Sequence, residues 1–599
     1  MKRIIKTYLP FITVILACVA FLPAVQAVVP PPDGGYAGFN TAEGTNALQN
    51  LTTGVGNAAV GWYSLFSNTD GSFNTALGAG TLLFNVGDQS TGEGIENTAT
   101  GTAALLSNTA GSFNTASGAW ALFSNTTGFA NTANGVRALY SNTTGSSNTA
   151  NGVSALLRNT TGFANTANGN QALASNTTGF NNTANGVSAL LSNTTGGNNT
   201  ADGAGALVRN TTGGDNTAVG FQTLFFNDTG SFNTAIGVNA LFSSPHSVSN
   251  SALGWGALFS NTTGSNNTAI GVRALENNTI GLANIAVGEQ ALDSNVEGNG
   301  NVAVGFQALQ ANTTTVNANG NVAVGYQALQ TNTIGDNNTA TGFKALHNNI
   351  EGYGNTAFGA GALDSNTLGF RNTAIGTFAL SDNIGGIFNT ANGAYALSHS
   401  TGAFNTALGA AAGDNVTSAS NVICIGSGGA NVSDSCFIGN IWGVTTVFND
   451  AIPVLVDSAG QLGTAGSSQR FKHQIKPMDR VSEAVLALKP VTFHYKTDTT
   501  NMPQFGLIAE EVAEVNPNLV VRDKNGEIYT VRYDAVNAML LNEFLKEHRK
   551  VQDQADIIAQ LQSRMDALVV HIQEQDSRIQ KVSDQLEMRK AAPQVASVK

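Results

Sequence analysis

A strict 17-residue period constrains this chain of 599 residues more than any other feature. Asparagines recur at that spacing, and each begins a version of "NTANGVRALYSNTTGSS". The aligned residues are Asn131, Asn148, Asn165, Asn182, Asn199, Asn216, Asn233, Asn250, Asn267, Asn284 and Asn301. With small changes of spacing, the register extends back to Asn40 and forward to Asn421. Because so short a unit cannot bury a core alone, it must stack on its neighbours, and the period predicts a solenoid.

Each coil has the same internal plan. "NTAxG" indicates a short strand that ends at glycine, "xxAL" supplies a buried leucine, and "SNTTG" is typical of a turn. The sequence leaves open whether "xxALxS" is a second strand or a helical turn, and which hand the solenoid has. At about 4.8 Å per coil, the repeats would form a rod on the order of 110 Å long. Its core of alanines and one leucine per coil is thin, so we expect several chains to wrap around a common axis.

The composition of the chain argues against some functions of the rod. Charged residues make up 11% of the chain and the formal net charge is -12, so no basic surface for nucleic acid is expected. The recurring Asn and Thr could form a ladder that binds glycans or ice, but we favour a structural role in turns and stacking, because backbone groups in turns need such partners. The repeats contain no catalytic or calcium-binding motif, and we expect no cofactor and no metal.

The N-terminus predicts export. "MKRIIK" precedes an apolar run over residues 8–25, and small residues follow, as in a signal peptide cleaved after Ala27. We therefore expect an extracellular or cell-surface protein without a transmembrane domain after signal removal. An uncleaved anchor and a lipoprotein attached through Cys18 are the alternatives. The sequence leaves open whether Cys424 and Cys436 form a disulfide.

The sequence changes character at "GSSQRFKHQI", residues 466–475. Before it, alternating apolar residues around Asp457–Gly460 suggest a hairpin. After it, "SEAVLALKP" predicts a short amphipathic helix, "VTFHYK" a strand, "FGLIAEEVAEVNPNLV" a strand and a helix, and "DKNGEIYTVRYDAV" a second hairpin. A small α+β domain is expected.

A heptad pattern follows this domain. Its apolar residues fall on three-, four- and seven-residue steps: Phe544, Val551, Ile558, Leu561, Met565, Leu568, Ile572, Ile579, Val582 and Leu586. This is the a and d seam of a coiled coil, which needs partner helices. The alternative is one amphipathic helix docked on its own domain.

Two resemblances add to this interpretation. "NTAIG", "NVAVG" and "NTALG" resemble the head repeats of trimeric autotransporter adhesins and the shafts of tail fibres. The order "SSQRFK", "LKPVTFHYK", "FGLIAEEV", "YTVRYDAV" and a helix resembles the intramolecular chaperone auto-processing domain of endosialidase tailspikes and tail fibres. That resemblance implies a trimerising chaperone that assembles the rod and then cuts itself off with a Ser-Lys dyad.

The family's motif of Ser, Asp, any residue, Arg, any residue and Lys places the nucleophile on Ser467 and the base on Lys472, with cleavage between Gly466 and Ser467. Ser468 stands where the family usually has Asp. Independently of the family, an exposed lysine with a pKa of about 10.4 is a poor base, so burial must lower its pKa. Positions five apart do not share a face of a strand or a helix, so the pair can meet only through a turn or across chains.

We predict a mainly β fold: a long parallel β-solenoid or β-roll, a small α+β chaperone domain and a C-terminal coiled-coil helix. The expected segments are a signal peptide (1–27), the repeat solenoid (28–440), a β linker (441–466), the auto-processing domain (467–535), the coiled-coil helix (536–590) and a disordered tail (591–599). The predicted protein is an exported homotrimeric fibre that releases its chaperone by autoproteolysis. Alternatives are an uncleaved fibre clamped by that domain and a glycan-binding stalk, whose receptor the sequence does not specify.

Overall fold

The computed structural model describes residues 36–312, 318–448, 450–457, 459–523 and 525–590. The chain divides into two compact units, with the boundary between Val444 and Thr445. The predicted signal peptide (1–27), with its Cys18, and the predicted tail (591–599) lie outside the described residues.

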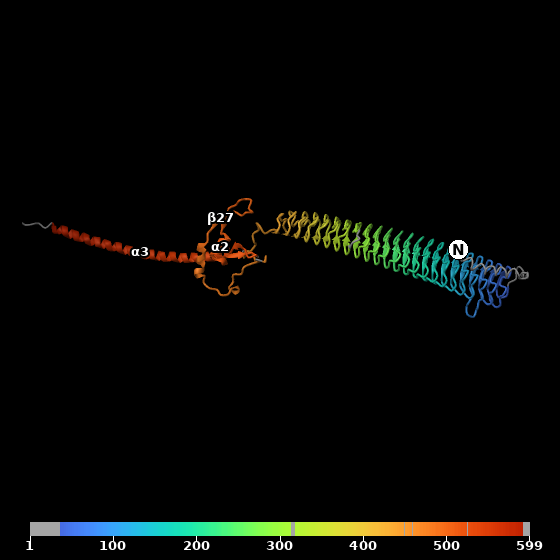
Figure 1. Cartoon of the computed structure of the whole chain (residues 1–599). Helices are drawn as coiled ribbons and strands as arrows, with labels where there is room; N and C mark the ends of the chain where they lie inside the picture. Colours follow the sequence, from blue (N-terminus) through green and yellow to red (C-terminus); the bar gives the residue numbers. More distant parts are fainter. Residues whose placement is uncertain (1–35, 313–317, 449, 458, 524, 591–599) are drawn as a thin grey trace, which may run out of the picture. The chain divides into compact units, whose positions relative to one another are not determined.

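The first unit is a parallel β-solenoid with a single 24-stranded sheet. Each strand pairs in parallel with the next one along the chain, and most paired residues are 17 apart, as in Thr132↔Thr149. The coils stack side by side along one axis (Figure 1). The strands are β1 (Thr41–Glu43), β2 (Ala58–Val60), β3 (Thr75–Leu77), β4 (Thr98–Thr100), β5 (Thr115–Ser117), β6 (Thr132–Asn134), β7 (Thr149–Asn151), β8 (Thr166–Asn168), β9 (Thr183–Asn185), β10 (Thr200–Asp202), β11 (Thr217–Val219), β12 (Thr234–Ile236), β13 (Ser251–Leu253), β14 (Thr268–Ile270), β15 (Ile285–Val287), β16 (Val302–Val304), β17 (Val322–Val324), β18 (Thr339–Thr341), β19 (Thr356–Phe358), β20 (Thr373–Ile375), β21 (Thr390–Asn392), β22 (Thr406–Leu408), β23 (Val422–Ile425) and β24 (Ser435–Ile438). The predicted fold class is confirmed.

The "AL" segment is neither a strand nor an α-helix. It forms turns in which the leucine has a left-handed backbone, with φ of 51° at Leu139 and 52° at Leu156. The N–H of Leu139 donates to the carbonyl of Ala155 in the next coil at 2.9 Å. The turns therefore carry inter-coil hydrogen bonds as the strands do, and these bonds hold a conformation that leucine seldom adopts.

Buried asparagines complete the interior. Asn165 Nδ2 donates to Asn148 Oδ1 at 3.1 Å and to the carbonyl of Gly179 at 2.9 Å. The Oδ1 of Asn165 accepts from both the N–H and the Nδ2 of Asn182, each at 3.0 Å. The asparagines that begin the coils thus form a ladder along the rod that ends at Asn405. The predicted extension of the register to Asn421 is wrong, because the next position is occupied by Val422 and Asn421 is exposed.

A second ladder lies in the "SNTTG" turns. Asn159 Nδ2 donates to Asn142 Oδ1 at 2.7 Å and to the carbonyl of Gly162 at 2.9 Å. In the same turns, Thr143 Oγ1 donates to the carbonyl of Thr160 at 3.0 Å. Both asparagine columns are buried, so the predicted structural role is confirmed for them.

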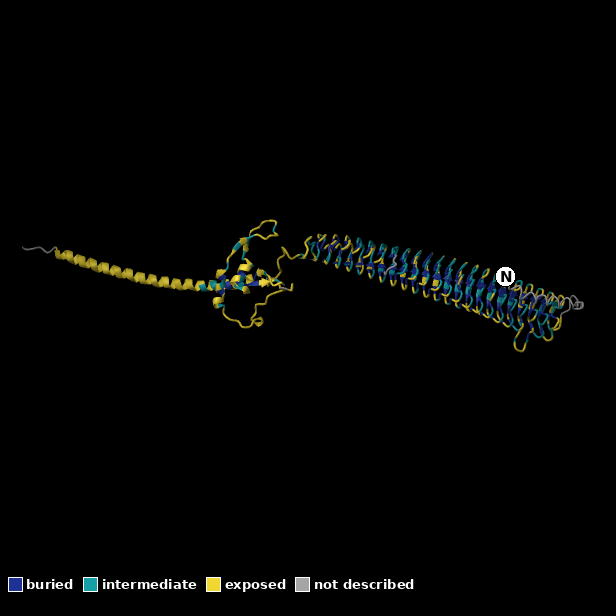
Figure 2. Ribbon diagram, viewed as in Figure 1, coloured by how far each residue is buried: buried dark blue, intermediate teal, exposed yellow. Residues whose placement is uncertain are grey.

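A single chain is enough to bury this core. The inward alanines and leucines, such as Ala150 and Leu156, have no exposed surface, and Figure 2 shows the buried residues along the inside of the coils. The thin apolar core therefore does not itself require other chains, because buried amides fill the remaining space. The trimer stays a prediction that rests on the second unit.

Insertions leave the stacking intact. The six extra residues before Asn97 form a loop closed by an isolated bridge between Asp88 and Glu93, and the register Thr75↔Thr98 is kept. A turn can therefore lengthen outward while the strands on either side stay paired.

The second unit is a small α+β domain that continues into a long helix. Its elements are β25 (Leu455–Val456), β26 (Leu462–Gly463), the 3-10 helices η1 (Gln469–Phe471) and η2 (Asp479–Ala487), β27 (Val491–Phe493), β28 (Gln504–Gly506), α2 (Ala509–Val515), the 3-10 helix η3 (Pro517–Leu519), β29 (Val520–Arg522), β30 (Ile528–Val531) and α3 (Tyr533–Lys590). Three antiparallel pairs, β25–β26, β27–β28 and β29–β30, form separate two-stranded sheets. The first and third are the hairpins that the sequence indicates, and residues 482–487 of "SEAVLALKP" lie in the 3-10 helix η2.

The domain has a small core. It contains Val485, Val512, Leu519, Val520, Val531, Val536 and Met539, the last two from α3. Beyond Lys546, every residue of α3 up to Lys590 is exposed. All ten seam residues are exposed, from 50% at Ile572 to 68% at Phe544. The helix therefore does not dock along its own domain, and its apolar stripe has no cover within the described chain.

Candidate functional site

The site at the start of the chaperone-like segment is built on one turn. Ser467 precedes η1 and Lys472 directly follows it. The N–H groups of Phe471 and Lys472 donate to the carbonyls of Ser468 and Gln469, both at 3.0 Å, and close the 3-10 turn. This turn brings Lys472 Nζ to within 3.0 Å of Ser467 Oγ, to which it donates a hydrogen bond. The structure thus brings the two predicted site residues together within one chain.

Neighbouring side chains shape this turn. A Cβ placed on Gly466 would lie 2.9 Å from the ring of Phe471, so the glycine lets that ring pack against the backbone before Ser467. The Arg470 guanidinium lies 4.6 Å from the centre of the same ring. The residue before the proposed nucleophile is therefore held close to the turn.

Ser468 is the N-cap residue of η1, with an extended backbone, and its side chain makes no capping hydrogen bond. Ser467, Ser468 and Lys472 are all exposed, as are His473 and His494. Among the described residues of a single chain, none buries the lysine as a general base would require.

A second serine and lysine meet elsewhere in the unit. Ser482 of η2 is fully buried, its Oγ donates to Glu543 Oε1, and it accepts from Asn542 Nδ2 at 2.6 Å and from Lys546 Nζ at 3.3 Å. Lys546 also donates to Glu543 Oε1 at 2.6 Å. Hydrogen bonds from Lys546 and Ser482 lower the pKa of the Glu543 carboxyl.

This cluster fixes the base of α3 to η2. Its serine cannot reach a substrate because it is buried, and its lysine is paired with a carboxylate. Sequence reasoning missed the cluster, because Ser482 and Lys546 are 64 residues apart and no motif links them.

The remaining candidate features are the cysteines, clusters of metal-ligating side chains and membrane-spanning helices. Cys424 is buried and Cys436 is exposed, and both are free thiols on neighbouring strands. In the described part of the chain, no three His, Cys, Asp or Glu side chains gather in a way that could hold a metal ion. Among the described helices, none combines the length and the apolar character needed to cross a membrane.

Comparison with known proteins bears on this site. Residues 467–521 match the model of the peptidase S74 family, described as the chaperone of endosialidase. No curated protein and no solved structure matches the chain. The match begins at Ser467, so the second unit contains a segment similar to an intramolecular chaperone with autoproteolytic activity, behind a long parallel β-solenoid.

Proposed function

We propose that this chain is an exported, trimeric, fibre-like protein whose C-terminal unit drives assembly and then releases itself by cutting between Gly466 and Ser467. One observation carries the proposal. The family match begins at Ser467, and the same residue accepts a hydrogen bond of 3.0 Å from Lys472 Nζ.

The cut can be written with named groups. Neutral Lys472 Nζ takes the proton from Ser467 Oγ, and the oxygen attacks the carbonyl carbon of Gly466. The amide bond between Gly466 and Ser467 breaks as an ester to Oγ forms, and the lysine returns its proton to the released amino group. Water then hydrolyses the ester, which leaves a carboxylate on Gly466 and restores the hydroxyl of Ser467.

Assembly would control this reaction. An exposed lysine is almost entirely protonated at neutral pH, so it cannot accept the serine proton. Burial lowers the pKa of a lysine, and neighbouring chains of a trimer are the available source of that burial. Cleavage would then follow assembly, and the rod would be released only after its strands had been brought together.

The test is electrophoresis and mass spectrometry of freshly expressed full-length chain. The wild type should yield a fragment of residues 467–599. Ser467→Ala and Lys472→Arg should each leave one uncut chain that still assembles, whereas Ser468→Ala should cut normally. An uncut wild type would favour a permanent clamp, and cleavage of Ser467→Ala would exclude the dyad.

A further inference from the structure

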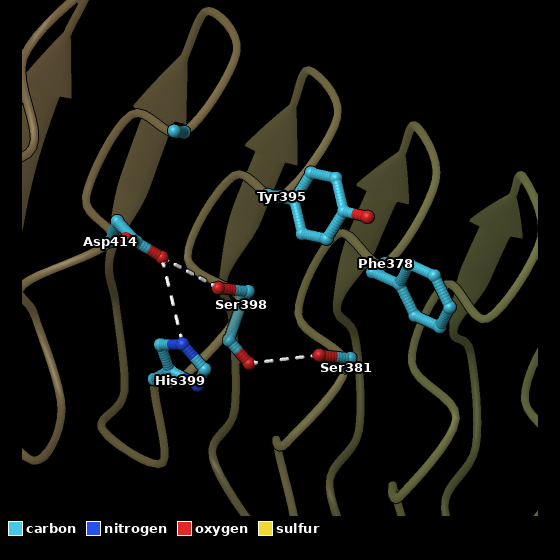
Figure 3. A pocket seen from close by; sticks show the side chains of 7 residues that line it. Phe378, Ser381, Tyr395, Ser398, His399 and Asp414 are labelled. Carbon is cyan, nitrogen blue, oxygen red and sulfur yellow. Dashed lines mark hydrogen bonds and ion pairs between the residues drawn. The ribbon is translucent and has the colours of Figure 1, made fainter.

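Three coils near the C-terminal end of the rod carry side chains that depart from the common repeat. Serine is the commonest residue after "ALx", as at Ser141, but here the residue is Asp382 and then His399. Two aromatic residues, Phe378 and Tyr395, occupy the second position after the coil glycine in the same coils. A surface pocket forms there, lined by Phe378, Ser381, Tyr395, Ser398, His399 and Asp414 (Figure 3). Sequence reasoning passed over these residues because it followed what the coils share.

One side of the pocket is an aromatic ledge. The rings of Phe378 and Tyr395 are stacked with their centres 5.6 Å apart, and the two residues are 41% and 51% exposed. Both have a left-handed backbone, with φ of 54° and 59°, where the preceding coil has Gly361. A Cβ on Gly361 would lie 2.5 Å from the ring of Phe378, so this glycine gives the ring room to lie against the rod.

Stacking of the coils does not require this ledge. Other coils have positive φ at this position with non-aromatic side chains, as at Arg137 and Gln171, and the two rings add nothing to the buried core. A solvent-exposed aromatic pair beside a few placed polar groups is typical of a binding surface.

The other side of the pocket is polar and ordered. Ser398 Oγ donates to Asp414 Oδ1 at 2.8 Å, and the His399 ring bonds Asp382 Oδ2 through Nδ1 at 2.8 Å. His399 Nε2 lies 3.8 Å from Asp414 Oδ1. These contacts hold two carboxylates beside the ledge, while about half of each aspartate side chain stays exposed.

Hydrolysis is not the activity that this arrangement supports. A serine nucleophile needs a base to take its proton, yet the Ser398 hydroxyl is bonded to Asp414 and not to His399. The combination instead suits recognition, in which an apolar surface takes the body of a ligand and a few placed polar groups orient it.

We propose that this pocket binds a neutral or amino sugar unit of a glycan. The C–H face of a sugar ring lies flat on aromatic rings, and its hydroxyl or ammonium groups donate to the free carboxylate oxygens. The pocket lining contains no lysine or arginine, so an acidic sugar would be repelled by Asp414 and by Asp382 beside it. The proposal places recognition in one pocket and not along the buried asparagine ladders, and it does not depend on self-cleavage.

The experiment uses the full-length chain on an array of neutral, amino and acidic oligosaccharides, followed by calorimetric titration with the saccharide that binds best. Tyr395→Ala and Asp414→Asn should each weaken binding at least about tenfold, since each removes one side of the pocket. The matched control is Phe163→Ala, which removes one ring of the exposed Phe163–Phe180 stack elsewhere on the rod and should leave affinity unchanged.

Circular dichroism melts of each variant check that the rod stays folded, and Tyr395→Phe keeps the ring if Tyr395→Ala does not fold. An array without any bound saccharide would overturn the proposal. So would equal binding by wild type, Tyr395→Ala and Asp414→Asn, and a preference for acidic sugars would overturn the assigned ligand class.

Discussion

The two units of this chain bury their side chains in opposite ways. In the solenoid, each coil places its alanine, leucine and asparagines inside, and the neighbouring coils cover them completely. In the C-terminal unit, a small core anchors the start of α3, and residues 547–590 then extend with every side chain exposed. The first arrangement is satisfied by one chain, whereas the second leaves an apolar seam that only further helices can cover.

The largest expected effect comes from removing that seam. A chain that ends at Lys550 keeps Val536, Met539 and Lys546, so the domain core and the Ser482 cluster remain. It loses most of the heptads, and we expect assembly to be lost while the solenoid stays folded. Light scattering with circular dichroism measures both properties. A truncated chain that still forms trimers would show that some other surface assembles the protein.

The next effect should be local to the rod. Replacing Asn165 with alanine leaves the N–H of Asn182 without an acceptor. It also removes one of the two acceptors of Asn182 Nδ2 and one of the two donors to the Gly179 carbonyl. Each unsatisfied buried group costs about 1–3 kcal/mol, so a loss of roughly 3–5 kcal/mol is expected in these coils. Hydrogen exchange at the N–H of Asn182 should report it. The exposed Asn170→Ala is the control, and equal protection in both variants would contradict the ladder.

A third effect depends on pH. Burial, followed by a hydrogen bond with Glu276, raises the pKa of Asp293 to about 6 from 3.8. An acid with a raised pKa costs no stability below its unfolded pKa. The cost grows as pH rises from the unfolded to the folded pKa and is constant above the folded value. Asp293→Asn should therefore stabilise the rod by up to about 3 kcal/mol near neutral pH and have little effect near pH 4.

Thermal melts of Asp293→Asn and wild type at several pH values test this sign. Asp202→Asn, at an exposed strand position, is the control and should show no such trend. A gain that is equal at acid and neutral pH would mean that ionisation of Asp293 is not the cause.

The repeats and the family motif explain which features could be predicted. The 17-residue spacing forces stacking whatever the details, so the parallel solenoid follows from sequence alone. The left-handed leucines do not, because nothing in leucine favours that conformation and only inter-coil bonds enforce it. The contact between Ser467 and Lys472 spans one turn and was predictable from spacing and resemblance. The Ser482 cluster and the pocket at Tyr395 depend on distant residues or on departures from the repeat.

The smallest expected effect concerns the contacts that His399 makes with Asp382 and Asp414 in the neighbouring coils. The hydrogen bond to Asp382, together with the charges of Asp382 and Asp414, raises the pKa of this imidazole above 6.5. A base with a raised pKa contributes stability that is fully present below its unfolded pKa and is lost as pH rises through the folded value. His399→Gln should therefore lower the melting temperature near pH 5.5 and leave it unchanged near pH 9. Because the side chain is 59% exposed, the difference in stability should be below about 1 kcal/mol and should shrink with added salt.

Asp382→Asn, which removes the first partner of the imidazole, should abolish most of the same pH dependence. An effect of His399→Gln that does not change between these two pH values would show that the ring acts by packing alone.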